Sequence, residues 1–230
     1  MKITVLTVMP ELFEGFFKSP VIQRAIRSAA VSVTVADIRD FVKGSFRAVD
    51  DSPYGGGAGM ILRCEPVIAA LEHFKTPRSH TILFSPAGKT YKEKDARRLS
   101  EEEDLILICG HYEGVDARIE KYCDELISLG DYILTGGEIC AMAVMDSVIR
   151  LFPESLKEEA TSKESFEHGL LEYPQYTRPR EFRGDAVPEV LLSGNHEAIE
   201  KWRREAALER TRRFRPDLLA SQDEASKAEI

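Results

Sequence analysis

The sequence predicts an α/β fold, in which helices cover a mainly parallel sheet, followed by a small helical domain at the C-terminus. Up to about residue 150, short β-branched segments alternate with longer segments of helical periodicity, as in parallel sheets with helical crossovers. The run Leu105-Ile106-Leu107-Ile108 is apolar throughout, which is typical of a strand that is buried on both faces. Beyond Phe152-Pro153 the composition becomes acidic and loses this periodicity, so we expect a boundary there.

The individual elements follow from periodicity and from turn residues. Strands are expected where β-branched or apolar runs are bounded by turn formers, at residues 2–8, 31–37, 80–85, 105–109, 125–129 and 132–134. Helices are expected at residues 11–29 (interrupted at Ser19-Pro20), 64–74, 92–100, 115–122 and 137–151. Near the C-terminus, Asn195 is a suitable N-cap for a helix that runs to about Phe214, and Pro216 is a suitable stop.

These elements predict three parts of the chain. Residues 1–157 form the α/β domain and residues 170–230 form the small helical domain. Residues 158–169 join them as a flexible interdomain linker, because residues 154–172 hold six acidic residues, two lysines and little apolar periodicity.

The charge of the chain is unevenly distributed. The net charge is −8 and the pI is about 5.3, which on average does not indicate a nucleic-acid-binding protein. However, residues 201–215 hold seven basic and two acidic residues. This segment predicts a basic helix face that contacts phosphates. The alternative is that its basic residues only pair with nearby acids such as Glu205 and Glu209.

Cysteine usage and hydropathy indicate a cytoplasmic protein with no membrane partner. The four cysteines form no CxxC pair, so we expect free and mostly buried thiols in a reducing compartment. No apolar run approaches the roughly 20 residues that a transmembrane helix needs. The first residues lack the charged and long apolar regions of a signal peptide.

Glycine-rich segments indicate a ligand pocket. Residues 110–116 directly follow the buried strand, residues 128–138 lead into a helix, and residues 85–89 end a third strand. Ligands of α/β sheets bind at the carboxyl ends of strands, and glycines there let a ligand approach the backbone. If the three strands are neighbours, these loops make one pocket. A further segment, residues 54–60, matches neither GxGxxG nor a phosphate loop, and is either a surface loop or a close backbone approach.

Five motifs in matching order carry a resemblance to a known family. They are Pro10-Glu11-Leu12-Phe13 and the segments at residues 50–60, 110–116, 130–138 and 169–179, which read DDSPYGGGAGM, GHYEGVD, GDYILTGGE and GLLEYPQYTRP. These motifs resemble the bacterial tRNA (guanine-N1)-methyltransferases, which are knotted, SPOUT-type enzymes, and the resemblance runs from Met1 to about Phe214.

The resemblance implies a fold, a reaction and partners. The N-terminal domain would contain a deep trefoil knot, and the enzyme would be a homodimer with each active site shared between chains. The product would be N1-methylguanosine at position 37 of tRNA, next to the anticodon, and activity would need magnesium through ligands that the motifs do not identify. S-adenosylmethionine would be bound in the knot by Pro86, Gly110, Tyr112, Glu113, Gly114, Leu129, Gly130, Asp131, Tyr132, Ile133, Leu134, Gly136 and Gly137.

The same resemblance implies catalytic and RNA-binding residues. The family's general base is an aspartate in an Asp-Ser-Phe motif, and the matching residues here are Glu164-Ser165-Phe166. Glu164 is therefore expected to remove the N1 proton; alternatively, Glu172 is the base, or the chain binds tRNA and reacts slowly. Arg150 matches the family arginine that steadies the guanine ring and its O6 atom. However, an arginine at a helix end also interacts with the helix dipole. Near Tyr173 and Tyr176, the expected tRNA contacts are Arg178, Arg180, Arg183, Lys201 and Arg204.

Three other functions compete with this interpretation. The motifs around Ser165 and Thr177 argue against a knotted methyltransferase that acts on ribose or ribosomal RNA. A non-catalytic RNA-binding protein is conceivable because Glu164 departs from the family pattern. A nucleotide-dependent dehydrogenase would share the α/β alternation, but the sequence lacks GxGxxG and an acidic ribose-binding residue at the expected offset.

Overall fold

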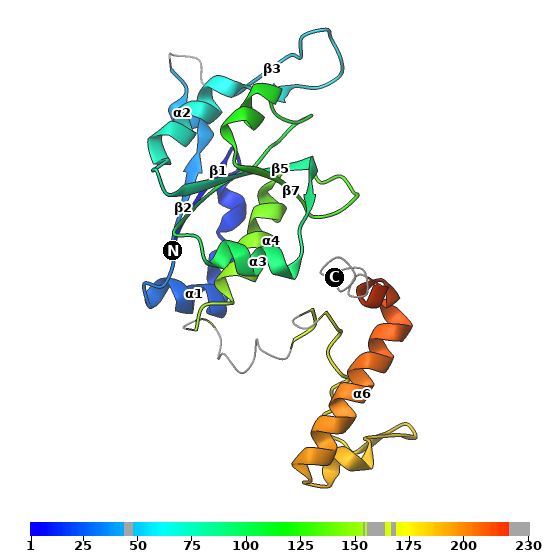
Figure 1. Ribbon diagram of the computed structural model, residues 1–230. Coiled ribbons are helices and arrows are strands. Elements are labelled where there is room, and N and C mark those ends of the chain that lie inside the picture. Colours follow the sequence, from blue (N-terminus) through cyan, green and yellow to red (C-terminus); the bar gives the residue numbers. More distant parts are fainter. Residues whose placement is uncertain (44–47, 154, 156–163, 167–168, 221–230) are drawn as a thin grey trace, which may run out of the picture. The chain divides into compact units, whose positions relative to one another are not determined.

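The computed structural model describes residues 1–43, 48–153, 155, 164–166 and 169–220 (Figure 1). The chain divides into two compact units, Met1–Glu158 and Glu159–Ile230. Within the described residues, no helix combines the length and the apolar character needed to cross a membrane. The predicted linker at residues 158–169 lies mostly outside the described residues, so the predicted domain boundaries stay predictions.

The first unit is built on a five-stranded sheet in the order β2-β1-β6-β5-β7. All its neighbouring strands are parallel, which confirms the predicted sheet type. The strands are β1 (Lys2–Thr7), β2 (Ser32–Asp37), β5 (Ser79–Thr90), β6 (Asp104–Ile108) and β7 (Glu125–Ser128). Every residue of the central strand β6 is buried, as its continuous apolar run predicts.

Helices cover both faces of this sheet (Figure 1). One apolar cluster packs α1 (Pro20–Arg27), α3 (Glu93–Ser100) and α4 (Glu138–Ile149) against one face. A second cluster packs α2 (Cys64–Phe74) and Ile119 of the 3₁₀ turn η4 (Ala117–Tyr122) against the other. Side chains on both sides of the sheet are thereby removed from water, and this burial is the main driving force for folding the unit.

Several predicted elements differ from the observed ones. The long helix predicted at residues 11–29 is broken into η1 (Pro10–Phe13), η2 (Phe16–Lys18) and α1. The strand predicted at residues 132–134 is wrong, because these residues pair with no strand and Ile133 is 81% exposed. The two-residue strands β3 (Asp50–Asp51) and β4 (Ile61–Leu62) and the turn η3 (Ile38–Phe41) are too short to give a periodic signal.

Strand β5 departs most from its prediction. It continues to Thr90, but its register shifts between Phe84 and Lys89, and both of these residues pair with Ile127 of β7. The chain between them leaves the ladder and returns to the same partner. The loop that was expected to follow the strand therefore lies within it.

The second unit contains the hairpin β8 (Glu181–Phe182) and β9 (Asp185–Ala186), the turn η5 (Glu189–Leu192) and the helix α6 (His196–Phe214). The side chain of Asn195 accepts a hydrogen bond from Ala198 N at 3.2 Å, which confirms the predicted N-cap. Helix α6 ends before Pro216, as predicted, although residues 216–220 are again helical.

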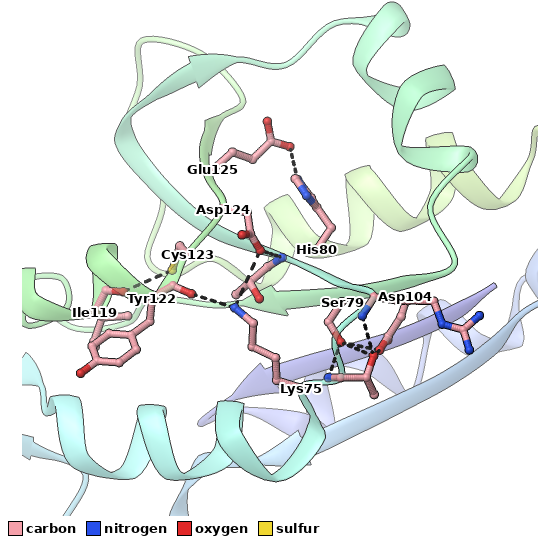
Figure 2. Close-up of polar contacts among 12 residues, drawn as sticks. Lys75, Ser79, His80, Asp104, Ile119, Tyr122, Cys123, Asp124 and Glu125 are labelled. Carbon is pink, nitrogen blue, oxygen red and sulfur yellow. Dashed lines mark hydrogen bonds and ion pairs between the residues drawn. The ribbon is translucent and has the colours of Figure 1, made fainter.

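Acidic side chains fix the amino-terminal ends of the central strands (Figure 2). Asp104 at the start of β6 is only 5% exposed, and its Oδ2 accepts hydrogen bonds from Ser79 Oγ at 2.5 Å and Thr76 Oγ1 at 3.2 Å. Its Oδ1 lies 3.7 Å from Lys2 Nζ. Because these residues lie on β1, β6 and the segment entering β5, Asp104 ties three neighbouring strands together at the edge opposite the predicted pocket.

We therefore expect Asp104→Ala to lower the free energy of unfolding by about 1–3 kcal/mol, because it removes the charged acceptor of the Ser79 and Thr76 hydroxyl groups. The neighbouring acid Glu103 is the matched control, since it pairs with Arg78 at an exposed position where both side chains are more than half accessible. Its replacement by Ala should cost less than about 1 kcal/mol. Urea unfolding of both variants measures the difference, and equal losses would contradict the role assigned to Asp104.

Candidate active site

A cavity lies beside three neighbouring strands. Strands β6, β5 and β7 are adjacent in the sheet, so the loops that follow β6 and β7 meet the excursion within β5. They enclose a cavity of about 400 Å³, which falls within the size range of small-molecule sites. The sequence predicted this juxtaposition only on the condition that the strands were neighbours, and the strand order meets that condition.

The structure brings together nearly all the residues predicted to bind the cofactor. All of them line the cavity except Asp131, which is exposed. Five further lining residues lie within the predicted pocket segments without having been predicted individually; they are Ser85, His111, Val115, Ser128 and Thr135. Phe84, Ile127 and Cys140 also line the cavity but lie outside those segments, and helical spacing one turn beyond Gly137 would have indicated Cys140.

Glycines allow backbone segments to approach one another closely in the cavity wall. A Cβ on Gly137 would lie 2.8 Å from Cys109 Cα, and Gly137 N donates a hydrogen bond to Gly110 O at 2.8 Å. The first turn of α4 is therefore held directly against the end of β6. No larger residue fits at this position without moving the main chain.

The glycine-rich segment at residues 54–60 combines both alternatives that its sequence left open. Tyr54 is fully exposed, as expected of a surface loop. At its other end, a Cβ on Gly59 would lie 2.3 Å from Glu113 Cγ, and Glu113 N donates to Met60 O at 3.0 Å. The segment therefore supports the loop after β6, although the part near Tyr54 extends into solvent.

Burial changes the protonation of the cavity residue Tyr112 and of Cys109, which precedes the cavity residue Gly110. Desolvation is the main reason that the pKa of Tyr112 is raised, and Asp50 adds to the effect. Burial is the main reason that the pKa of the Cys109 thiol is raised well above its usual value, and Glu138 adds to this. Both groups are therefore neutral at physiological pH. All four cysteines are free; Cys109 is buried, whereas Cys64, Cys123 and Cys140 are only partly buried.

The two predicted catalytic residues lie in different units. Arg150 is the C-cap of α4 and is partly buried. Glu164 belongs to the second unit, where it is partly buried at the start of the Glu164-Ser165-Phe166 motif. That motif is anchored, because Ser165 Oγ accepts a hydrogen bond from Glu172 N at 3.0 Å and Phe166 N donates to Leu170 O at 2.7 Å.

The predicted tRNA contacts share one property, which is exposure. The exposed residues are Arg178, Arg180, Arg183, Lys201 and Arg204. In contrast, Arg203 of α6 is partly buried, with its guanidinium 2.6 Å from Glu200 Oε1 and 4.9 Å from the ring centroid of Tyr173. Lys201 lies 4.0 Å from Glu205, so pairing with acids accounts for part of the basic helix.

The expected magnesium requirement has no visible counterpart among the residues described here. Across residues 1–43, 48–153, 155, 164–166 and 169–220, no group of three or more His, Cys, Asp or Glu side chains is placed to hold a metal ion.

Comparison with known proteins identifies the family. The family model described as tRNA (Guanine-1)-methyltransferase TrmD matches residues 1–221. A protein from Moorella thermoacetica that is named tRNA (guanine-N(1)-)-methyltransferase is 51% identical over 96% of this chain and 90% of that protein. A protein of the same name from Malacoplasma penetrans is 50% identical over 95% of this chain and 96% of that protein. A third relative, from Sulfurihydrogenibium sp., is 50% identical over 95% of this chain and 87% of that protein. These matches exclude the dehydrogenase hypothesis, and the chain belongs to the tRNA (guanine-1)-methyltransferase TrmD family.

Proposed function

We propose that this protein transfers a methyl group from S-adenosylmethionine to N1 of guanosine 37 in tRNA. The observation that carries the proposal is the cavity beside β6, β5 and β7, which is lined by motifs that resemble those of the family. The names of the relatives supply the reaction, and the cavity supplies a place for the methyl donor.

The cavity fits the proposed donor. Its backbone-rich walls, formed by the loops at residues 110–114 and 129–137, present N–H and C=O groups that read an adenine edge without side chains. Pro86 closes a third side from the excursion within β5. When bound, S-adenosylmethionine supplies a methyl group on a sulfonium. The sulfur departs as a neutral thioether, so no covalent enzyme intermediate is needed. The role of the protein is therefore to position the reactants and to stabilise charge.

The remaining chemistry is assigned to two side chains. Guanine N1 carries a proton in neutral water and is a poor nucleophile until this proton leaves. The carboxylate of Glu164 accepts it as general base. The guanidinium of Arg150 stabilises the negative charge that develops on O6 as the proton is lost. An active site shared between the chains of a homodimer would provide both residues to one guanosine.

The resemblance favours Glu164 over Glu172 as the base. The side chain of Gln175 donates a hydrogen bond to Glu172 Oε1. The backbone of Glu172 in turn holds Ser165 next to Glu164. Glu172 thus supports the motif, while Glu164 occupies the position of the family's aspartate. The extra methylene of glutamate extends the carboxylate by roughly an ångström relative to aspartate.

The second unit supports the proposed tRNA contacts. Arg178, Arg180 and Arg183 are exposed on one continuous stretch, together with Tyr176, which is 50% exposed. Guanidinium groups contact phosphates and exposed aromatic rings stack on unpaired bases, so this stretch has the composition of an RNA-binding surface. Lys201 and Arg204 add exposed positive charge from α6.

The knot and the homodimer belong to the proposal as family properties. The excursion within β5 packs tightly on β7, because a Cβ on Gly88 would lie 2.5 Å from Ile127 N. Exposed apolar residues support the homodimer: Tyr132 and Ile133, which line the cavity, are 56% and 81% exposed, and Ile139 in the first turn of α4 is 56% exposed. Large apolar side chains that gather on a surface are typical of protein interfaces.

Methylation of a tRNA transcript with guanosine at position 37 tests the function. With S-adenosylmethionine carrying a labelled methyl group, we expect one labelled N1-methylguanosine per transcript, and none when another base replaces that guanosine. Methylation of ribose, or of another base, would favour a different knotted methyltransferase. Binding of the transcript with no methyl transfer in a single turnover would favour the non-catalytic RNA-binding protein.

A further inference from the structure

Three polar side chains from distant segments meet at the cavity wall. Thr7 ends β1, His111 lies in the loop after β6, and Glu138 is the first residue of α4. Thr7 Oγ1 donates a hydrogen bond to Glu138 Oε1 at 2.7 Å, and His111 Nδ1 lies 3.6 Å from Glu138 Oε2. His111 lines the cavity, whereas Glu138 does not. The carboxylate of Glu138 therefore contacts the cavity residue His111 without lining the cavity itself.

The burial of this carboxylate requires an explanation. Glu138 is 2% exposed and Thr7 is completely buried, and an unpaired buried carboxylate costs several kcal/mol. One hydroxyl donor and the amino-terminal end of α4 offset part of this cost. The imidazole of His111 is the third compensating group, because it places a ring nitrogen beside Oε2.

His111 in turn needs a hydrogen-bond partner for one of its ring nitrogens. Its Nδ1 is buried and makes no hydrogen bond within the part of the chain that the structure describes. A buried ring nitrogen needs a hydrogen-bond partner. If Nδ1 carried the ring proton, its N–H group would point at the carboxylate of Glu138. The gap of 3.6 Å closes to a hydrogen bond with a movement of less than an ångström, as polar contacts in binding sites often do when a ligand binds.

Gly136 shows how tightly this pair is enclosed. A Cβ on Gly136 would lie 2.2 Å from Glu138 Oε2 and 2.6 Å from His111 Nδ1. The bare backbone of the loop before α4 therefore covers the contact between the two side chains. The network links the end of β1, the loop at residues 110–114 and the loop that ends at Gly137, and the last two form much of the cavity wall.

We propose that Glu138 is a positioning residue for cofactor binding, which fixes the His111 ring through an Nδ1–H hydrogen bond and thereby holds the loop at residues 110–114 in its binding conformation. The inference rests on the proposed cofactor site. Glu138 acts through His111 and touches no ligand itself. This role resembles that of the carboxylates that orient histidines behind binding sites.

The tautomer of His111 tests the inference directly. In the full-length protein labelled with ¹⁵N-histidine, at about pH 8, long-range ¹H–¹⁵N spectra should show His111 with its proton on Nδ1. In Glu138→Gln, the amide oxygen still accepts from Thr7, but the amide nitrogen donates to Nδ1, so the proton should move to Nε2. In Glu138→Leu, which offers Nδ1 no hydrogen-bond partner, the affinity for S-adenosylhomocysteine, measured by calorimetry, should fall about 10-fold.

Three further variants make the result interpretable. His111→Gln removes the His111 signal and so assigns it. Glu65→Gln changes another acid in the first turn of a helix, far from this network in the sequence, and should alter neither the tautomer nor the affinity. Thr7→Val removes the hydroxyl donor but keeps the pair, and provides a second test should Glu138→Gln not fold; His111 should then keep its proton on Nδ1.

The possible outcomes separate this inference from the proposed function. If the unchanged protein does not bind S-adenosylhomocysteine, the cofactor site is wrong and the inference fails with it. If the unchanged protein binds but already carries the His111 proton on Nε2, the inference alone is wrong. It is also wrong if Glu138→Gln leaves the proton on Nδ1, or if Glu138→Leu leaves the affinity unchanged.

Discussion

Glu164→Gln should lower the rate of methyl transfer by about 10²–10⁴-fold, which is the contribution that a general base makes. The amide keeps the size of the side chain but cannot accept the N1 proton at neutral pH. Glu164 lies in the second unit, away from the cavity loops in the sequence, so the affinity for S-adenosylhomocysteine should remain unchanged. Single-turnover methylation of the tRNA transcript measures the rate, and calorimetry measures the affinity.

Two companion variants distinguish Glu164 from its rival. Glu172→Gln replaces the neighbouring carboxylate, which accepts from Gln175, and should have a much smaller effect on the rate. Glu164→Asp restores the family's residue and should retain activity, because the proton acceptor remains. If Glu164→Gln kept a near-normal rate of methyl transfer and Glu172→Gln lost most of it, Glu172 would be the general base instead.

The sequence was most informative where a local pattern determines the structure. The apolar run of β6 predicts a strand that is buried on both faces, and Asn195 predicts the start of α6, because each depends on residues close in the chain. The cavity was predictable for a related reason. Parallel strands place their carboxyl ends at one edge, so glycine-rich loops after neighbouring strands converge there.

Contacts between distant residues could not be predicted from local patterns. Thr7 and Glu138 are 131 positions apart, and neither residue type signals a partner, so their hydrogen bond emerges only from the fold. The strand predicted at residues 132–134 failed for a similar reason. Tyr132 and Ile133 have high β propensity, but they have no neighbouring strand with which to pair. The continuation of β5 after Gly88 depends on pairing with β7, which is also invisible locally.

The packing of Gly88 leads to the second large expected effect. A Cβ at this position would lie 2.5 Å from Ile127 N and 2.6 Å from the carbonyl carbon of Leu126, both of which are backbone atoms of β7. Backbone atoms in a paired strand cannot rotate away as a side chain can, so Gly88→Ala must displace either β7 or the excursion within β5. We expect a loss of about 3 kcal/mol in the free energy of unfolding, at the upper end of the usual cost of overpacking.

The same displacement should weaken cofactor binding, because Pro86 and Ile127 flank Gly88 and line the cavity. Urea unfolding and calorimetry with S-adenosylhomocysteine measure the two effects. Gly15→Ala is the matched control: Gly15 has helical backbone angles, and a Cβ there would meet no atom within 4 Å. This variant should be as stable as the unchanged protein or slightly more stable, since alanine restricts the unfolded chain. Equal stability and affinity of the two variants would show that the contact between Gly88 and β7 tolerates a side chain, and the effects expected from this close packing would then be wrong.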